Sequence, residues 1–317
     1  MDGPFARAEG PSSLVELAEA GGLAFHSRGR KPRPVTFTGS SAAAALPFGP
    51  GSSTALDRSR SHQMEHHATS RAVAGLFHLD WSPPDLRGPP LLLIHGAGGS
   101  HRHWPLEARE LPGRRVIAVD LPGHGDSPGP GRRSVAEYAR HLLALLDALA
   151  IDRAVVVGHS MGGAIALTLA LDSPDRVAGL GLVGTGARLR VTPALLQATA
   201  DPATFPAAVE VMTDWSFGPG ASPDLRSEFS EGLRRLPASV VHGDFCACDQ
   251  FDVLARLGEL RMPTAVVCGD ADRSTPPRYS EYLQAHIAGA RLTLVPDAGH
   301  MVALEAPAAT VAALAGL

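Results

Sequence analysis

The sequence predicts an α/β protein in which a mostly parallel sheet is wound with helices. From Val73 onward, short continuous apolar runs alternate with helical patterns, which is typical of parallel strands joined by crossover helices. The runs contain almost no polar residues, as expected for strands covered on both faces. A chain of 317 residues with 44% hydrophobic content is also long enough to bury a large core. We therefore expect one domain with a central sheet, flanking helices and an insertion.

Six apolar runs are the expected strands of this sheet. They are Leu91–Ile94, Val116–Val119, Ala154–Val157, Ala178–Val183, Ala265–Val267 and Leu292–Val295. Between the second and third runs, residues 134–150 place their apolar side chains on one helical stripe. Ser134 and Glu137 have the spacing of a capping box at the start of this helix. The helix should cover one face of the sheet.

The regular alternation breaks in residues 187–260. Helical fragments such as Pro193–Ala200 and Pro223–Leu236 replace the expected strand there, and Pro and Gly residues separate them. We expect residues 187–260 to form a helical cap inserted into a core of residues 64–186 and 261–317. Residues 1–63 show no sustained period of 2 or 3.6, so we expect a disordered or extraneous N-terminal extension, with Met64 as the true start.

Composition excludes several classes of function. A net charge of −4 provides no broad basic surface, so we expect neither nucleic acid nor an anionic membrane as a partner. The single lysine, Lys31, lies in a segment that fits neither a P-loop nor Schiff-base chemistry. Three cysteines do not make a disulfide framework, and no run of 18 apolar residues exists. We expect a cytoplasmic protein with a small-molecule substrate; the sequence leaves its oligomeric state open.

The motif Gly158-His159-Ser160-Met161-Gly162 is the strongest chemical signal in the chain. It stands directly after the apolar strand Ala154–Val157 and directly before a helical run. A glycine on either side of the serine allows a sharp turn from strand to helix, which exposes the hydroxyl at the end of the sheet. The following helix also points its N-terminal N–H groups at developing negative charge. The motif in this context predicts Ser160 as a nucleophile.

A serine nucleophile requires a base, and the base requires an orienting acid. Asp270 and Asp272 follow the strand at 265–267, and His300 follows the strand at 292–295. Because the carboxyl ends of parallel strands lie along one edge of a sheet, these side chains can converge with Ser160. The sequence therefore predicts a Ser, Asp and His triad.

Four segments of the chain together resemble the α/β-hydrolase superfamily. They are Asp120–Ser127, Gly158–Gly163, Gly269–Pro276 and Ala298–His300. The resemblance covers about residues 91–317, and the chain is most similar to carboxylesterases related to pimeloyl-acyl-carrier-protein methyl ester esterase. It implies Asp272 as the acid, with Asp270 as the alternative, and the chain order Ser, Asp, His is the order of this family.

The resemblance also implies where the oxyanion is stabilised. The loop His95–Gly99 follows a strand and is similar to the family loop that supplies one backbone N–H. Carried over by position, the two donors are the N–H groups of Ala97 and Met161. His300 would take the Ser160 proton, and an acyl-enzyme would form and then be hydrolysed by water. This mechanism requires no metal or organic cofactor.

The resemblance implies a carboxylic ester hydrolase of class EC 3.1.1, most simply a carboxylesterase. The same triad also serves thioesterases, lactonases, carbon–carbon bond hydrolases and cofactor-free haloperoxidases, which the sequence separates poorly. Serine at position 160 excludes the family branches that use aspartate there. A non-catalytic ligand receptor on the same fold is the alternative from a different class.

Several further side chains have open or structural interpretations. His62, His66 and His67 lack the additional ligands of a metal site. His101 and His103 follow the glycine-rich loop, are expected at the start of a helix near the pocket rim, and are candidates for a substrate contact. Trp215 and Phe217 either line the acyl pocket or anchor the cap, and both alternatives stay open at this point. Cys246 and Cys248 are expected to pack where the cap rejoins the core.

Overall fold

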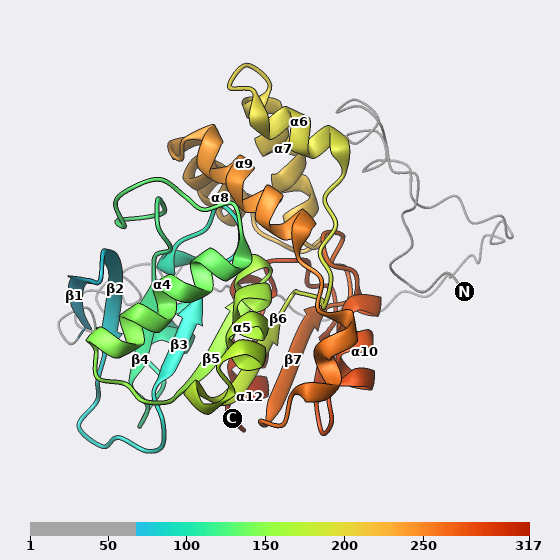
Figure 1. Cartoon of the computed structure of the whole chain (residues 1–317). Coiled ribbons are helices and arrows are strands. Elements are labelled where there is room, and N and C mark those ends of the chain that lie inside the picture. Colours follow the sequence, from blue (N-terminus) through green and yellow to red (C-terminus); the bar gives the residue numbers. More distant parts are fainter. Residues whose placement is uncertain (1–67) are drawn as a thin grey trace, which may run out of the picture.

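The computed structural model describes residues 68–317, which form one sheet with helices on both faces (Figure 1). The strands are β1 (Ala68–Val73), β2 (Leu76–Trp81), β3 (Leu91–Ile94), β4 (Val116–Val119), β5 (Ala154–His159), β6 (Val177–Val183), β7 (Thr264–Gly269) and β8 (Arg291–Val295). Their order across the sheet is β1-β2-β4-β3-β5-β6-β7-β8. Every pair from β4 to β8 is parallel, which confirms the predicted sheet. The expectation for residues 1–63 lies outside the described residues.

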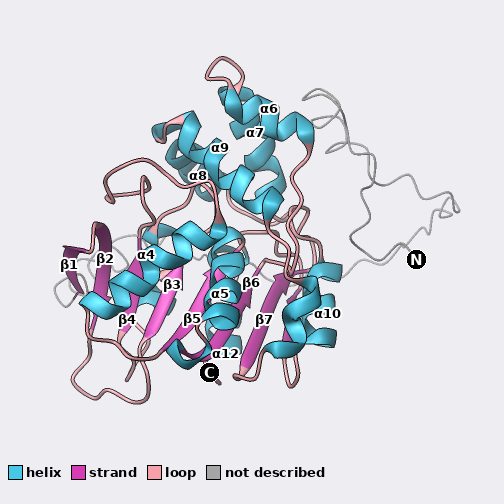
Figure 2. Ribbon diagram, in the orientation of Figure 1, coloured by secondary structure: helices cyan, strands magenta, loops and turns pink. Residues whose placement is uncertain are grey.

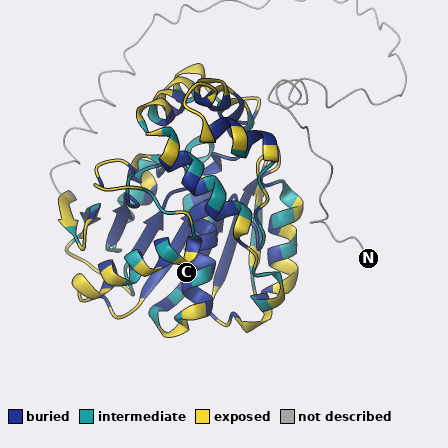
Figure 3. Ribbon diagram, turned by 45° about the horizontal axis from the view of Figure 1, so that its top comes forward, coloured by how far each residue is buried: buried dark blue, intermediate teal, exposed yellow. Residues whose placement is uncertain are grey.

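The central strands are buried along their whole length, as their apolar runs predict. Every residue of β3, β4, β5 and β7 is buried, and each of the six expected runs lies within an observed strand. Figure 3 shows the strands as the buried centre of the molecule, with the exposed residues on the outer faces of the helices. The expectation of full coverage is wrong for β8, where Leu294 is 42% exposed. β8 is the edge strand and has a neighbour on one side only.

The hairpin of β1 and β2 was not predicted. β1 pairs with β2 in the antiparallel direction, and β2 pairs in the antiparallel direction with β4, which joins the hairpin to the rest of the sheet. Its buried positions include His78 and Asp80, so the alternating pattern of β2 places polar residues inward. Asp80 is paired with Arg115, whose Nη2 lies 2.7 Å from Oδ2. Because the inward face of β2 is partly polar, its sequence contains no continuous apolar run that would predict a strand.

Two layers of helices cover the two faces of the sheet (Figure 2). The first layer contains α4 (Val135–Ala148), α5 (Met161–Asp172) and α10 (Pro277–His286), and the second contains α3 (Leu106–Arg109), α11 (Val302–Glu305) and α12 (Pro307–Leu314). Short 3-10 turns lie at His101–His103, Pro174–Arg176 and Leu254–Glu259. Successive side chains of a strand point to opposite faces. Leu92 accordingly packs with the first layer, and Leu91 and Leu93 pack with the second.

Helix α4 covers the sheet as predicted, but its start differs from the expectation. Tyr138, Leu142 and Leu145 are fully buried on its inner stripe. Ser134 is the N-cap residue, yet its side chain makes no capping hydrogen bond, so the predicted capping box is wrong. The Ser134 carbonyl accepts from the N–H of Glu137 instead. Apolar burial rather than capping therefore stabilises this helix.

Four helices form a separate layer above the carboxyl ends of the strands (Figure 1). They are α6 (Pro193–Ala200), α7 (Phe205–Ser216), α8 (Pro223–Arg235) and α9 (Ala238–Gln250), and residues 193–250 are called the cap segment below. The cap segment lies between β6 and β7 and has an apolar cluster of its own. An isolated antiparallel bridge pairs Arg188 with Asp252, so the chain leaves and rejoins the core side by side. Within residues 68–317, no helix has the length and apolar content that crossing a bilayer requires.

Candidate active site

Ser160 occupies the sharp turn between β5 and α5. Its φ of 53° and ψ of −118° form a conformation that is costly for any residue except glycine. Two hydrogen bonds hold the turn: the Ser160 N–H donates to the Val183 carbonyl at 2.9 Å, and Thr185 Oγ1 donates to the Ser160 carbonyl at 2.8 Å. The surrounding sheet therefore fixes the strained turn that presents the hydroxyl.

The glycines beside Ser160 are required by close backbone contacts. A Cβ atom on Gly158 would lie 2.0 Å from the carbonyl oxygen of Gly162. A Cβ atom on Gly162 would lie 2.3 Å from the carbonyl oxygen of Ile94 in β3. Both distances are far shorter than any non-bonded contact, so only glycine allows α5 to start this close to β3 and β5.

His300 and Asp272 form a buried hydrogen-bonded pair. His300 Nδ1 lies 2.9 Å from Asp272 Oδ2, and the two residues are 7% and 3% exposed. Asp272 Oδ1 accepts the N–H groups of Ser274 and Thr275 at 2.9 and 2.8 Å. Thr275 Oγ1 donates to Asp272 Oδ2 at 2.9 Å. These donors satisfy the carboxylate and fix the side on which it receives the imidazole.

The structure separates the two aspartates that the sequence left as candidates for the acid. Asp272 contacts His300, whereas Asp270 Oδ1 accepts the N–H of Asp297 at 2.8 Å and is exposed. Asp270 thus braces the turn that leads to His300. The geometry favours Asp272 as the orienting group.

The loop that follows β3 lies directly against Ser160. A Cβ atom on Gly96 would be 3.0 Å from Ser160 Cβ. His95 anchors the loop: its Nδ1–H donates to the Gly96 carbonyl at 2.8 Å, and its Nε2 accepts the N–H of Leu121 at 3.0 Å. Burial lowers the pKa of His95 to about 3, so the ring is neutral and can both donate and accept. Ala97 lines the cavity beside Ser160.

His159 supports the main chain of His300. Its Nε2–H donates to the His300 carbonyl at 2.9 Å, and the two ring centroids are 4.7 Å apart. Burial, reinforced by repulsion from a charged His300, keeps the pKa of His159 well below 6.5. His159 is therefore neutral and adds no positive charge beside His300.

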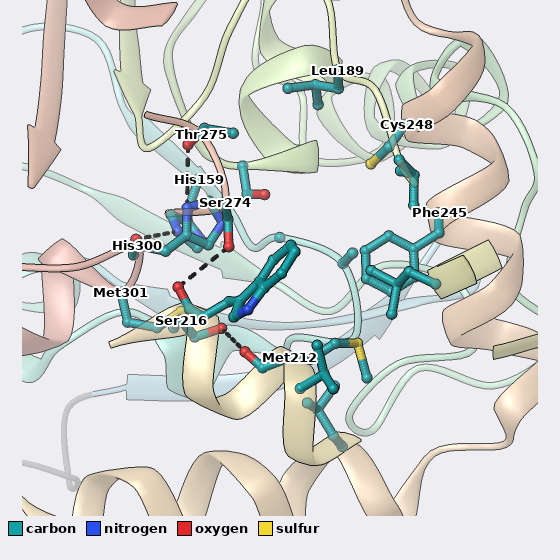
Figure 4. A pocket seen from close by; sticks show the side chains of 18 of the residues that line it. His159, Leu189, Met212, Ser216, Phe245, Cys248, Ser274, Thr275, His300 and Met301 are labelled. Atoms are coloured by element: carbon teal, nitrogen blue, oxygen red, sulfur yellow. Dashed lines mark hydrogen bonds between the residues drawn. The ribbon is translucent and has the colours of Figure 1, made fainter. Parts of the chain in front are cut away.

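One cavity beneath the cap segment is lined by three of the five predicted site residues. Ser160, His300 and Ala97 line it, and Met161 lies directly behind Ser160 at the start of α5. Figure 4 shows His300, His159 and Thr275 on one side, with Met212, Phe245 and Cys248 across from them. Large apolar side chains from the cap segment and its neighbouring loops form much of the cavity wall. They are Leu189, Val191, Leu195, Val211, Met212, Trp215, Phe229, Leu233, Phe245 and Met301.

Comparison with known proteins places the chain in a family. A family model described as "alpha/beta hydrolase fold" matches residues 89–307. The chain belongs to the α/β-hydrolase family. This confirms the resemblance that the sequence motifs indicated, and with it the predicted fold class.

Curated relatives of this α/β-hydrolase carry out different reactions. The chain is 34% identical to a dihydrolipoyllysine-residue acetyltransferase component of the acetoin cleaving system of Pseudomonas putida, over 69% of this chain and 60% of that protein. It is 33% identical to a 2-hydroxymuconate semialdehyde hydrolase of Pseudomonas putida, over 69% and 83% of the two chains. It is 30% identical to a pimeloyl-[acyl-carrier protein] methyl ester esterase of Neisseria meningitidis (strain FAM18), over 66% and 85%. Hydrolase chemistry is common to the last two, while their substrates differ.

The structure also settles two interpretations that the sequence left open. Trp215 lines the cavity of this α/β-hydrolase, whereas Phe217 packs edge-on against Phe229 within the cap segment, at 5.3 Å between ring centroids. Cys248 lines the cavity, and Cys246 lies 3.4 Å from His242 Nε2. His62, His66 and His67 lie outside the described residues.

One group of possible metal ligands serves a different role in the loop after β4. His101, Asp120 and Asp126 lie close together. The Asp120 carboxylate accepts the N–H of His101 at 2.6 Å and the N–H of Asp126 at 2.9 Å, and it pairs with His101 Nδ1. Its oxygens are thus engaged in holding two loops of the α/β-hydrolase core together.

Sequence reasoning missed two residues that shape the site, Thr275 and Asp244, and anticipated a third. Thr275 supports Asp272, and nothing in its pattern distinguishes it from other turn threonines. Of the two histidines after the glycine-rich loop, His103 lines the cavity and stacks on Phe229 at 5.5 Å between ring centroids, whereas His101 pairs with Asp120 instead. Asp244 contacts the loop His95–Gly99 from the cap segment, and no spacing rule marks a single aspartate within a helix.

Proposed function

We propose that this chain is a serine hydrolase that cleaves carboxylic esters through an acyl-enzyme on Ser160. The observation that carries the proposal is the 2.9 Å contact between His300 Nδ1 and Asp272 Oδ2, since His300 and Ser160 line the same cavity. An imidazole that donates through Nδ1 keeps Nε2 free to accept a proton. Asp272 thereby selects the tautomer that a serine nucleophile requires.

The catalytic cycle follows from this arrangement. His300 takes the proton of Ser160 as the hydroxyl oxygen attacks the ester carbonyl. The N–H groups of Ala97 and Met161 receive the negative oxygen of the tetrahedral intermediate, and the N-terminal end of α5 adds a favourable dipole. His300 then protonates the departing alcohol, and water, deprotonated by His300, hydrolyses the acyl-enzyme.

The lining of the cavity supports an uncharged, largely apolar substrate. Among the residues that line it, none is Asp, Glu or Lys, and the cation is Arg190. Arg190 donates to the Asp249 carbonyl and lies 3.8 Å from Asp252, so its charge is already partnered. Apolar walls with few polar groups are typical of sites for small to medium acyl or aryl groups. Carboxylic esters of that size fit best, and thioesters, lactones and ring-cleavage products are the other substrates to compare.

A panel of 4-nitrophenyl esters of increasing chain length tests the proposal. We expect the wild-type protein to hydrolyse them, and Ser160→Ala to lose at least about 10⁴-fold in kcat/KM. A thioester, a lactone and a carbon–carbon ring-cleavage substrate belong in the same panel and would reveal a different preference. If the wild-type protein shows no turnover above that of Ser160→Ala on any substrate, the proposed hydrolase activity is refuted and the ligand-receptor alternative is favoured.

Labelling with a fluorophosphonate provides a second test that does not depend on the choice of substrate. Intact mass spectrometry should show one added group on the wild-type protein and none on Ser160→Ala. Ser216→Ala is the matched control, because Ser216 lines the same cavity but its hydroxyl donates to the Met212 carbonyl at 2.7 Å. Labelling that persists in Ser160→Ala would contradict the assignment of the nucleophile.

A further inference from the structure

Asp244 is a fully buried carboxylate that reaches from the cap segment into the core. It lies on α9 and is 0% exposed. Its Oδ2 accepts the N–H of Gly98 at 2.8 Å and lies 2.7 Å from His124 Nε2. Its Oδ1 accepts the hydroxyl of Tyr138 at 2.6 Å. Burying a carboxylate is costly unless it is fully paired, and these three partners supply that pairing.

The three partners belong to different parts of the core. Gly98 lies in the loop His95–Gly99, called the oxyanion loop below, one residue after Ala97. His124 lies in the loop that follows β4, and Tyr138 lies on α4. Burial opposes a charge on His124, but the neighbouring carboxylate outweighs it, and the pKa of His124 is raised. The 2.7 Å contact between His124 Nε2 and Asp244 Oδ2 lies in a water-poor setting, where charge-assisted hydrogen bonds are strong and directional.

A second helix of the cap segment contacts the oxyanion loop at the same residue. Gly98 has a φ of 65°, and a Cβ atom there would lie 2.4 Å from Leu233 Cδ2 of α8. Leu233 presses on one side of Gly98 while Asp244 on α9 binds its N–H. The loop is therefore held between the core strand that precedes it and two helices of the cap segment.

We propose that Asp244 is a positioning residue that holds the oxyanion loop in its catalytic geometry, so that oxyanion stabilisation depends on the seated cap segment. The inference rests on the proposed function of Ser160 and Ala97. The hydrogen bond from Gly98 fixes the peptide plane between Ala97 and Gly98. Fixing this plane restrains the backbone around the N–H of Ala97. Because an oxyanion donor must lie within about 2.7–3.1 Å of the developing charge, a small displacement weakens the transition state more than the bound substrate.

The test is to remove the acceptor and then to restore it. Asp244→Leu keeps the branching and the number of side-chain heavy atoms but accepts no hydrogen bond, and we expect kcat for a 4-nitrophenyl ester to fall about 10- to 100-fold, with KM changed less than threefold. Asp244→Asn keeps an oxygen acceptor for Gly98 and should recover most of that loss. A boronic acid that forms a tetrahedral adduct on Ser160 should bind Asp244→Leu more weakly by the same factor as kcat/KM falls.

Tyr138→Phe is the matched control for a merely structural role. It removes the hydrogen bond to Oδ1 within the same buried cluster but leaves the contact between Asp244 and Gly98. We expect its melting temperature to fall while kcat stays within about threefold of wild type. Equal losses of kcat in Tyr138→Phe and Asp244→Leu, or a loss confined to KM, would overturn the inference.

Two further comparisons keep the result interpretable. If Asp244→Leu does not fold, Asp244→Glu moves the carboxylate by one methylene and should still lower kcat, with recovery in Asp244→Asn; wild-type kcat in Asp244→Glu would overturn the inference. If the wild-type protein hydrolyses esters and Asp244→Leu and Asp244→Glu both keep its full kcat, the role of Asp244 is refuted while the proposed function stands. A wild-type protein that neither hydrolyses esters nor reacts with fluorophosphonate would refute the proposed function, and the inference with it.

Discussion

The sheet core and the cap segment hold the site in two different ways. In the core, backbone contacts do the positioning: glycine is required at 158 and 162, and a strained turn at Ser160 is tied to neighbouring strands. In the cap segment, side chains position the site: apolar residues line the cavity, and the carboxylate of Asp244 accepts the N–H of Gly98. The core therefore fixes the position of Ser160 through its backbone, while the cap segment supplies apolar walls to the cavity and an acceptor for the N–H of Gly98.

Exchanging an acid in the core should produce the largest effect. Asp272→Asn removes the carboxylate that orients His300 but preserves its shape, and we expect kcat/KM to fall about 10³- to 10⁴-fold. Asp270→Asn is the control, because Asp270 contacts the main chain of Asp297, and its activity should stay within about threefold of wild type. Steady-state kinetics of both variants measure the contrast. A greater loss in Asp270→Asn would reverse the assignment of the acid.

Replacing a glycine by alanine should change the free energy of unfolding in opposite directions in the core and in the cap segment. Gly158→Ala introduces a clash with the Gly162 carbonyl, and we expect a loss of about 3 kcal/mol or more in the free energy of unfolding. Gly232→Ala lies within helix α8, where a Cβ atom meets no other atom within 4 Å, so it should gain about 0.5–1 kcal/mol. Denaturant unfolding monitored by circular dichroism compares the two. Similar values would remove the contrast between backbone-determined and side-chain-determined regions.

Enlarging the cavity from the cap side should change selectivity rather than the chemical step. Phe245→Ala removes an aromatic wall across from His300, and we expect the preference for longer over shorter acyl chains to change about 5- to 30-fold. The kcat for 4-nitrophenyl acetate should change less than threefold, because the acetyl group does not reach that wall. The ratio of kcat/KM between hexanoate and acetate measures the effect. An equal loss on both esters would mean that Phe245 supports the site as a whole.

The smallest effect concerns protonation at the boundary of the two regions. Burial lowers the pKa of His103 to about 4, below the 6.5 of an unfolded chain. The unfolded state therefore binds more protons between pH 6.5 and 4, and stability decreases as the pH falls through this window. His103→Phe keeps a ring against Phe229 but cannot titrate, so the melting temperature should fall less between pH 6.5 and 4.5 than in wild type. An unchanged slope would show that His103 does not contribute.

The sequence predicted the parts of the structure that local patterns determine. Apolar runs located six strands, and the strand, turn and helix context around Ser160 located the turn that carries it. The hairpin of β1 and β2 was missed, because inward His78 and Asp80 interrupt its apolar pattern. The predicted capping box at Ser134 was wrong, because burial of the inner stripe is enough to fix α4. Asp244 could not be predicted, because its three partners lie 106 to 146 residues away in the chain.

The roles of Ser160, Asp272, His300, Ala97 and Met161 in catalysis stay predictions. The structure places Ser160, His300 and Ala97 along one cavity, Asp272 against His300, and Met161 at the start of α5, which is the arrangement the mechanism requires. Substrate choice could not be predicted, because it depends on how four helices pack over the cavity. Helix packing of this kind depends on contacts between residues that are distant in sequence.

The bridge between Arg188 and Asp252 makes the cap segment a candidate for transplantation. Because the two ends of the insert are held side by side, where Arg188 Nε donates to Asp252 Oδ2 at 2.7 Å, a donor segment with similarly spaced ends could be spliced at these residues without moving the strands. Such a chimera would inherit the donor's selectivity on this chain's catalytic core. It would function fully only if the graft also supplied an acceptor in the place of Asp244, so each exchangeable cap must carry its own connection to the oxyanion loop.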